Sequence, residues 1–253
     1  MRIADPASMA PVPPAPADRR TLIEEVTIVL ALSVLNSAVF AVLDLLSAPL
    51  KGVVVAVGDQ SIRFSYQFLD FLFGLVPVFL VLHLVRRDGE GLVGIGLQTD
   101  RPRSDVARGL WLFAIVAGGG LAIYLGAVKL GVNRFVIPVP PMGHWWTVPA
   151  LFMNAAEAAL VEEIIVLGYL VTRLQQLSFS PVAAIVAAAL LRGSYHLYQG
   201  WGGFTGNLLM GLLFGTLFLR WRRTWPFVVA HFLLDVGAGV GFLVFRSHLP
   251  GFS

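Results

Sequence analysis

Residues 161–170, VEEIIVLGYL, place two adjacent glutamates, Glu162 and Glu163, inside a run that is otherwise almost wholly apolar. The surrounding chain has the composition of a membrane protein: of its 253 residues, 57% are hydrophobic and 13% are charged, and its mean hydropathy is +0.79. Soluble domains contain about 25% charged residues. A charge inside a membrane span costs about 2.5 to 3.5 kcal/mol, so two neighbouring carboxylates there need a physical reason.

Long apolar windows recur along the chain, each near the roughly 20 residues that a spanning helix needs. They cover residues 26–48, 65–85, 109–131, 147–171, 182–199, 205–220 and 225–245. We therefore predict an all-α fold, a polytopic transmembrane helix bundle of about seven or eight helices. No internal repeat indicates a transporter built of two halves.

The two ends of the chain differ in character. Residues 1–20 are rich in proline and alanine and have no apolar segment, which predicts a disordered tail rather than a signal peptide. Residues 21–253 then form a transmembrane helical domain. If the seven windows alternate in direction, most arginines lie on the side of this tail, so the positive-inside rule predicts a cytoplasmic N-terminus.

Charge and cysteine content exclude several functions. The net charge is +3 and the pI is about 9.6, but no basic stripe with interleaved aromatic residues occurs, so we expect no nucleic-acid partner. The chain contains no cysteine, which excludes disulfides, thiolate metal ligands and a cysteine nucleophile.

Ionisable residues inside the predicted spans are few, and most of them lie in the C-terminal half. They are Asp44, Asp70, Glu157, Glu162, Glu163, Arg192, His196, His231 and Asp235.

Their spacing predicts that several of them meet. Residues four apart share one face of a helix, as Arg192 and His196 do on one predicted helix and His231 and Asp235 do on another. Glu162 and His196 lie equally far from the predicted turn near residue 179, so an antiparallel hairpin brings them to the same depth. His231 follows the arginine-rich turn at residues 222–223 closely. We expect these groups to converge in the cytoplasmic half of the membrane.

Such a cluster has the chemistry of hydrolysis. A carboxylate beside an imidazole, shielded from bulk water, can hold a water molecule and take its proton. A second imidazole and carboxyl group could stabilise an oxyanion or complete a metal site. The residues Glu162, His196, His231 and Asp235 are of types that suit zinc, although the chain has no HExxH motif.

The order of these residues on successive predicted helices resembles the CPBP family of intramembrane proteases, also called Abi or type II CAAX prenyl endopeptidase-like proteins. The resemblance covers residues 147–240, within a protease-like core at 147–245. The family's EExxxRG motif aligns with residues 162–168, EEIIVLG. Its FxxxH motif aligns with residues 192–196, RGSYH, and its HxxxN or HxxxD motif with residues 231–235, HFLLD.

The resemblance implies a role for each residue. Glu162 would be the general base that positions water together with His196, and His231 and Asp235 would bind the oxyanion. Glu163 completes this catalytic set. Arg192 and Glu157 are expected to contact the catalytic residues without contacting the substrate. The resemblance leaves both a metal-free and a metal-dependent protease open.

Two positions depart from the family motifs: the motif arginine is Leu167, and the motif phenylalanine is Arg192. We interpret the two departures as one exchange, in which the guanidinium is lost from the glutamate helix and returned from the facing helix. Arg192 would then pair with Glu162 or Glu163, because two adjacent buried carboxylates need a cation. The departures also leave open a member of the family without catalytic activity.

Together, these features predict an intramembrane endopeptidase in a bacterial plasma membrane. Its partners would be membrane lipid and a membrane-associated or lipidated peptide substrate. Two alternative functions make different predictions about the intramembrane charges and about catalysis. A proton-coupled transporter would need Glu157, Asp44 or Asp70 to line the same pathway as the glutamate pair. A non-catalytic relative would bind a membrane peptide and shield it.

Overall fold

The computed structural model describes residues 19–47, 53–55 and 63–248. The predicted tail at residues 1–18 lies outside the described residues. Of the tail predicted over residues 1–20, only Arg19 and Arg20 are described, and both belong to the first helix.

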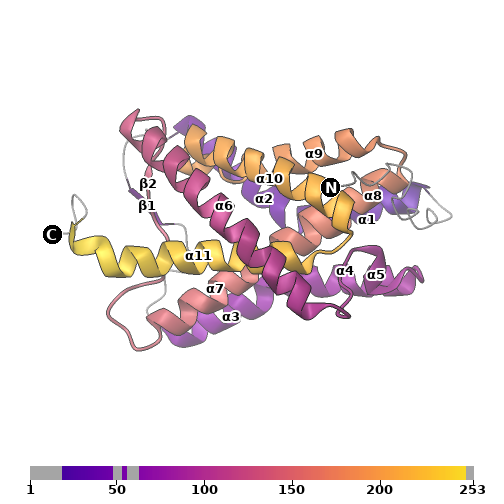
Figure 1. Cartoon of the computed structure of the whole chain (residues 1–253), viewed down its shortest axis with the longest axis horizontal. Coiled ribbons are helices and arrows are strands. Elements are labelled where there is room, and N and C mark those ends of the chain that lie inside the picture. Colours follow the sequence, from indigo (N-terminus) through magenta and orange to yellow (C-terminus); the bar gives the residue numbers. More distant parts are fainter. Residues whose placement is uncertain (1–18, 48–52, 56–62, 249–253) are drawn as a thin grey trace.

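Most of the described chain is helical, and most of the long helices run along the long axis of the molecule (Figure 1). The α-helices are α1 (Arg19–Ala31), α2 (Val34–Ser47), α3 (Phe64–Gly74), α4 (Val76–Arg87), α5 (Gly91–Gly94), α6 (Pro102–Lys129), α7 (Thr147–Val161), α8 (Val171–Gln176), α9 (Pro181–Ser194), α10 (Trp201–Trp221) and α11 (Trp225–Phe245). The remaining elements are the π-helix η2 (Glu162–Leu170), the 3₁₀ helices η3 (Leu197–Gln199) and η4 (Arg246–His248), and the strands β1 (Val53–Val55) and β2 (Phe135–Ile137).

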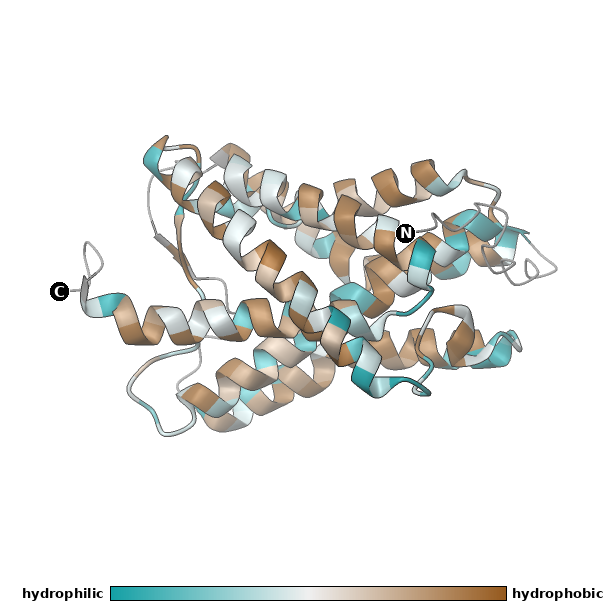
Figure 2. Ribbon diagram, in the orientation of Figure 1, coloured by the Kyte–Doolittle hydropathy of each residue, from teal (hydrophilic) through white to brown (hydrophobic). Residues whose placement is uncertain are grey.

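The predicted all-α polytopic bundle is confirmed, with fewer full-length spans than windows. Within the described residues, four helical segments are long and apolar enough to cross a membrane, or five if the bent pair α1 and α2 counts as one span. The four are Phe64–Arg87, Pro102–Lys129, Trp201–Trp221 and Trp225–Phe245. Hydrophobic residues cover the helices, while hydrophilic residues gather mainly at the right-hand end of the view (Figure 2).

The other windows are helical but broken. The window at 26–48 bends by 53° between α1 and α2. The window at 147–171 changes from α-helix to π-helix at Glu162. The window at 182–199 was predicted as one helix, but α9 ends at Ser194, and a turn and η3 follow. Two of these breaks lie in elements that carry side chains of the glutamate cluster, and the bend between α1 and α2 lines the pocket beside Glu162.

A pair of short strands was not expected in an all-α chain. β1 and β2 run parallel, with Val54 opposite Val136, and they join the segment after α2 to the segment after α6. Valine and isoleucine favour extended backbone. The pairing satisfies backbone groups at the end of the bundle opposite the hydrophilic end (Figure 1).

Glycines allow the helices behind the site to pack closely. A β-carbon at Gly211 of α10 would lie 2.9 Å from Ala189 of α9, and one at Gly215 would lie 2.8 Å from Ile185. Small residues at such spacing let two backbones approach within a membrane. The α9–α10 pair therefore forms a tight hairpin that holds Arg192.

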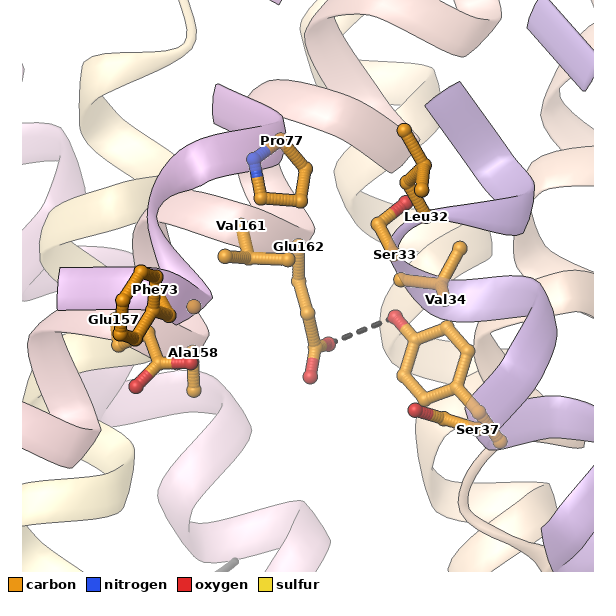
Figure 3. A pocket seen from close by; sticks show the side chains of 12 residues that line it. Leu32, Ser33, Val34, Ser37, Phe73, Pro77, Glu157, Ala158, Val161 and Glu162 are labelled. Atoms are coloured by element: carbon orange, nitrogen blue, oxygen red, sulfur yellow. Dashed lines mark hydrogen bonds between the residues drawn. The ribbon is translucent and has the colours of Figure 1, made fainter. Parts of the chain in front are cut away.

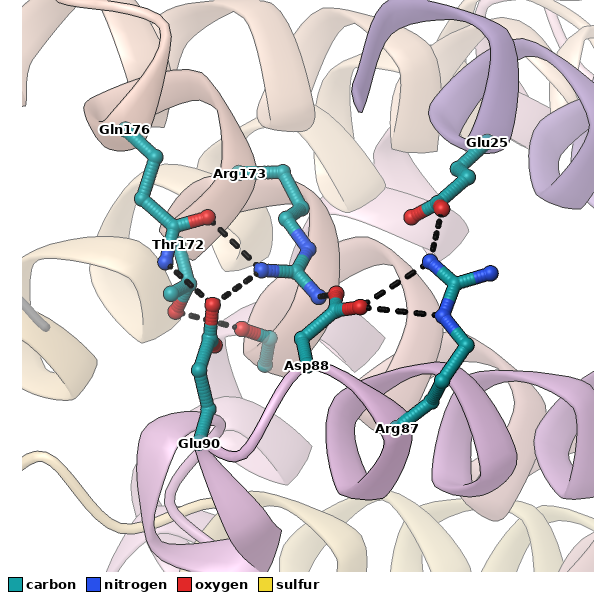
Figure 4. Close-up of polar contacts among 8 residues, drawn as sticks. Glu25, Arg87, Asp88, Glu90, Thr172, Arg173 and Gln176 are labelled. Carbon is teal, nitrogen blue, oxygen red and sulfur yellow. Dashed lines mark hydrogen bonds and ion pairs between the residues drawn. The ribbon is translucent and has the colours of Figure 1, made fainter. Parts of the chain in front are cut away.

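At the hydrophilic end, a buried polar network joins α8 to the end of α4 (Figure 4). Arg173 is fully buried and donates to Asp88 at 2.8 Å and to Glu90 at 2.5 Å. Asp88 also accepts from Arg87, which in turn contacts Glu25 of α1. The network fixes the helix that carries the glutamate pair to two other helices.

A second network holds the turn between α10 and α11. Arg223 donates to both oxygens of Asp105, at 2.5 and 2.6 Å, and to Asp100 at 2.7 Å. The hydrogen bond from Arg223 lowers the pKa of Asp100. Thr224, the next residue, donates through its hydroxyl to the carbonyl of Ile95 at 2.6 Å. These bonds set the position from which α11 begins.

Gly168 lies where the glutamate helix contacts both the backbone at Ile95 and Thr224, just before α11. A β-carbon at Gly168 would lie 2.8 Å from the carbonyl oxygen of Ile95 and 3.0 Å from the hydroxyl of Thr224. Backbone and a bonded hydroxyl cannot move aside easily. This close approach explains a glycine within a π-helix.

We expect Gly168→Ala to lower the thermal unfolding midpoint in detergent, at a cost of about 1 to 3 kcal/mol, because the added methyl group overpacks the contact. Gly118→Ala is the matched control: nothing lies within 4 Å of its β-carbon position on α6. The control should keep or raise the midpoint, since alanine favours helix over glycine by about 0.5 to 1 kcal/mol. Equal midpoints for the two variants would contradict this account.

Candidate active site

The glutamate pair opens the π-helix η2, which runs from Glu162 to Leu170. In a π-helix the hydrogen bonds join residues five apart, and such segments are frequent at functional sites. Residue 167 therefore follows Glu162 by one turn. The adjacent glutamates point in different directions around the helix and meet different neighbours.

Glu162 faces the end of α9. Its Oε2 accepts a hydrogen bond from the hydroxyl of Tyr195 at 2.8 Å and lies 3.3 Å from Nη2 of Arg192. Its other oxygen, Oε1, has no hydrogen-bond partner among the described residues. The side chain is 14% exposed, so this free oxygen can meet water or substrate.

Glu163 faces α11 and is fully buried. Its Oε1 lies 2.8 Å from Nδ1 of His231 and 2.8 Å from Nη1 of Arg192. Nε2 of His231 lies 3.5 Å from Asp235 on the same helix. Both ring nitrogens of His231 thus face carboxylate oxygens, which only accept hydrogen bonds, and this arrangement suits a doubly protonated ring.

Arg192 is the cation at the centre of the cluster. Its guanidinium, on a side chain that is 2% exposed, pairs with both glutamates. The predicted pairing of Arg192 with the glutamates is therefore present. Nη2 of Arg192 also lies 3.2 Å from Nδ1 of His231, but this nitrogen cannot donate to Glu163 and accept from arginine at once. We favour the shorter bond, from His231 to Glu163.

His196 lies just beyond the end of α9, so it is not on the same regular helix as Arg192. Its Nδ1 lies 3.0 Å from the carbonyl oxygen of Arg192. A carbonyl can only accept, so Nδ1 carries the hydrogen and, in the neutral ring, Nε2 is free to take a proton. Arg192 contacts Glu162 across the two helices as predicted. The side chain that forms a hydrogen bond with Glu162, however, is Tyr195 rather than His196.

Glu162 and Tyr195 line a pocket of about 250 Å³ between α2, α3, α4 and α7 (Figure 3). Its walls are largely apolar, with Glu157 on one side and the break between α1 and α2 on the other. The lining residues are Leu32, Ser33, Val34, Ser37, Phe73, Gly74, Pro77, Glu157, Ala158, Val161, Glu162 and Tyr195. His231 and Asp235 do not belong to this lining: His231 is buried against Glu163, and the side chain of Asp235 is 42% exposed.

The three acidic residues named for a transporter lie in different places. Glu157 lines the pocket beside Glu162. Asp44 pairs with Arg134, near the strands, and Asp70 lies on an exposed face of α3. Glu157 thus shares a pocket with Glu162, as the transporter alternative expects, whereas Asp44 and Asp70 are not part of the pocket lining.

No group of three or more His, Asp or Glu side chains in the described part of the chain is arranged to hold a metal ion. The guanidinium of Arg192 lies between Glu162, Glu163 and His231, so a cation already lies among the expected donors. Metal binding by Glu162, His196, His231 and Asp235 stays a prediction.

Comparison with known protein families finds a match over the region that contains the glutamate cluster. Residues 144–237 match the family model described as type II CAAX prenyl endopeptidase Rce1-like. No curated protein and no solved structure gave a significant match. The predicted resemblance is confirmed for this region, and the match supports a CAAX-type protease in an integral membrane protein.

Tyr195 is the contact residue that the sequence analysis missed. It lies inside the RGSYH stretch, three residues after Arg192, and this spacing places both side chains on one face of a helix. Its hydroxyl reaches Glu162 just past the end of α9 at Ser194. The spacing from Arg192 could have revealed this contact, but tyrosine is not among the ionisable side chains counted within the predicted spans.

Replacing Arg192 by leucine should destabilise the fold by about 3 to 5 kcal/mol, because Glu163 would remain buried without its cation. The measurement is the thermal unfolding midpoint of the purified protein. The double variant Leu167→Arg with Arg192→Leu returns the cation to the position of the family motif, one π-helical turn from Glu162. It should recover much of the loss. An Arg192→Leu variant as stable as the parent would refute the exchange.

Proposed function

We propose that this protein is an intramembrane endopeptidase that hydrolyses a peptide bond of a membrane-associated or lipidated protein with a water molecule activated by Glu162. The observation that carries the proposal is the free Oε1 of Glu162. It faces the pocket while Oε2 is held by Tyr195 and Arg192. A carboxylate positioned by one oxygen and open at the other is arranged as a general base.

In the proposed reaction, Oε1 of Glu162 takes a proton from water as the water oxygen attacks the carbonyl carbon of the peptide bond. A tetrahedral intermediate forms, with negative charge on the former carbonyl oxygen. The bond from carbon to nitrogen then breaks, and the proton passes from Glu162 to the leaving amine. The free Nε2 of His196 provides a second proton acceptor beside the same water.

We assign the oxyanion to His231, as the resemblance implies. Glu163 holds one side of its ring at 2.8 Å, whereas its contact with Asp235 is long, at 3.5 Å, and can yield to a stronger acceptor. A cationic ring in a buried position stabilises developing negative charge more strongly than it would in water. Glu163 orients the ring and acts by holding both His231 and Arg192.

We further propose that the N-terminus is cytoplasmic and that the protein lies in a bacterial plasma membrane. The support is the placement of positive side chains at the end where α4, α8 and the α10–α11 turn lie (Figure 1). These residues are Arg19, Arg20, Arg86, Arg87, Arg101, Arg103, Arg108, Arg173, Arg220, Arg222 and Arg223. Lys129, Arg134 and Arg246 lie toward the other end.

Glu162→Ala should reduce cleavage of fluorogenic membrane peptides by at least about 100-fold, as expected for loss of a general base. The protein would be purified in detergent and tested with and without a zinc chelator. Activity that survives the chelator and is lost in the variant supports a glutamate protease without metal.

Two other results would point elsewhere. Loss of activity in the chelator as well would show a metal dependence that the arrangement around Arg192 does not support. A folded parent protein that cleaves no peptide would favour a non-catalytic relative. Proton uptake coupled to solute transport in liposomes would favour the transporter.

Tyr195→Phe should lower kcat by about tenfold with little change in KM, because it removes one hydrogen bond to a charged oxygen that positions Glu162. Tyr124→Phe is the matched control: the Tyr124 hydroxyl accepts from the backbone of Val136, near the strands. The control should retain full activity. A rise in KM alone in the Tyr195 variant would place this residue in substrate binding instead.

A further inference from the structure

The pocket beside Glu162 contains a second carboxylate that the proposed reaction does not use. Glu157 of α7 is half-buried and lines the same pocket. Its carboxylate has no hydrogen bond and no ion pair among the described residues. A charged carboxylate in a largely apolar pocket is costly without a partner, so a cation that enters the pocket would stabilise the ionised form of Glu157.

The surroundings of Glu157 are arranged around its carboxylate. The carboxylate packs against Gly74 at the end of α3, and any side chain at that position would collide with it. Asp70, one turn earlier on α3, adds a further negative charge that acts on Glu157. By contrast, the charge of Glu162 is already offset by Arg192. Among the residues that line the pocket, no cationic side chain lies beside Glu157.

The distance from Glu157 to the proposed base sets the position of the missing partner. The two glutamates are separated by five positions, and α-helical rise places them about 7.5 Å apart along the axis. An extended peptide advances about 3.3 to 3.6 Å per residue. A substrate side chain that reaches Glu157 thus belongs to a residue about two positions from the bond that Glu162 faces.

We propose that Glu157 binds a cationic side chain, lysine or arginine, of the peptide substrate, about two residues from the cleaved bond. This inference rests on the proposed peptidase function, because it assigns part of that substrate. The apolar walls formed by Phe73, Pro77 and Val34 would hold the aliphatic stem of the side chain, and Glu157 would accept from its charged end.

The test uses the full chain in nanodiscs and peptide pairs that differ only in lysine or norleucine, placed two residues before or after the cleaved bond. The parent should prefer the lysine peptide by about tenfold in kcat/KM at one of these positions, as a charge-assisted bond in a partly buried site allows. Glu157→Gln should bring this ratio close to one, and Glu157→Lys should reverse it for a glutamate peptide. Glu24→Gln, an exposed carboxylate on α1, should leave the ratio unchanged.

Binding provides a readout that does not need catalysis. Fluorescence anisotropy of the same labelled peptides on Glu162→Gln should show about tenfold tighter binding of the lysine peptide, lost when Glu157→Gln is added. If Glu162→Gln binds the lysine peptide more tightly but the parent cleaves no peptide, the protease is refuted and the cation site is retained. Cleavage and binding without a lysine preference, or a preference that survives Glu157→Gln in a folded protein, would refute the cation site alone.

Discussion

The arrangement of the site depends on one constraint: two adjacent carboxylates buried in an apolar bundle must share a cation. Arg192 meets that constraint, because its two terminal nitrogens reach Glu162 and Glu163 from the facing helix. Removing one partner of such a buried group leaves an unpaired charge, which is far more costly than never having had the pair. The tight α9–α10 hairpin and the buried Arg173 network both act to keep this geometry in place.

The π-helix gives the two adjacent glutamates different surroundings and therefore different roles. Glu163 is turned inward, where it holds His231 and Arg192 and has no exposure. Glu162 is turned toward the pocket, with one oxygen held and one free. Two identical side chains in consecutive positions thus meet different surroundings. The one with access to the pocket suits proton transfer, and the one without access suits support.

Much of this could be predicted from the sequence, because helical spacing and membrane depth follow simple geometry. The pairing of Arg192 with the glutamates and the approach of His231 to the same cluster follow from the order of charges and the turns between windows. The π-helix, the bend between α1 and α2 and the early end of α9 could not be predicted, since each depends on tertiary packing rather than on local residue type. Tyr195 was missed although it lies three residues after Arg192, because only charged and imidazole side chains were counted within the spans. The place of the Arg192 guanidinium among the expected metal ligands could not be read from residue types alone.

The two positions that depart from the family motifs also constrain the order in which such a site can change. A chain with arginine at both 167 and 192 would keep its carboxylates paired, although crowded. A chain with arginine at neither would leave Glu163 buried and alone. With leucine at position 167, Arg192 therefore cannot be replaced by a neutral residue on its own. Any tolerated replacement must bring a second change that supplies a cation to Glu163.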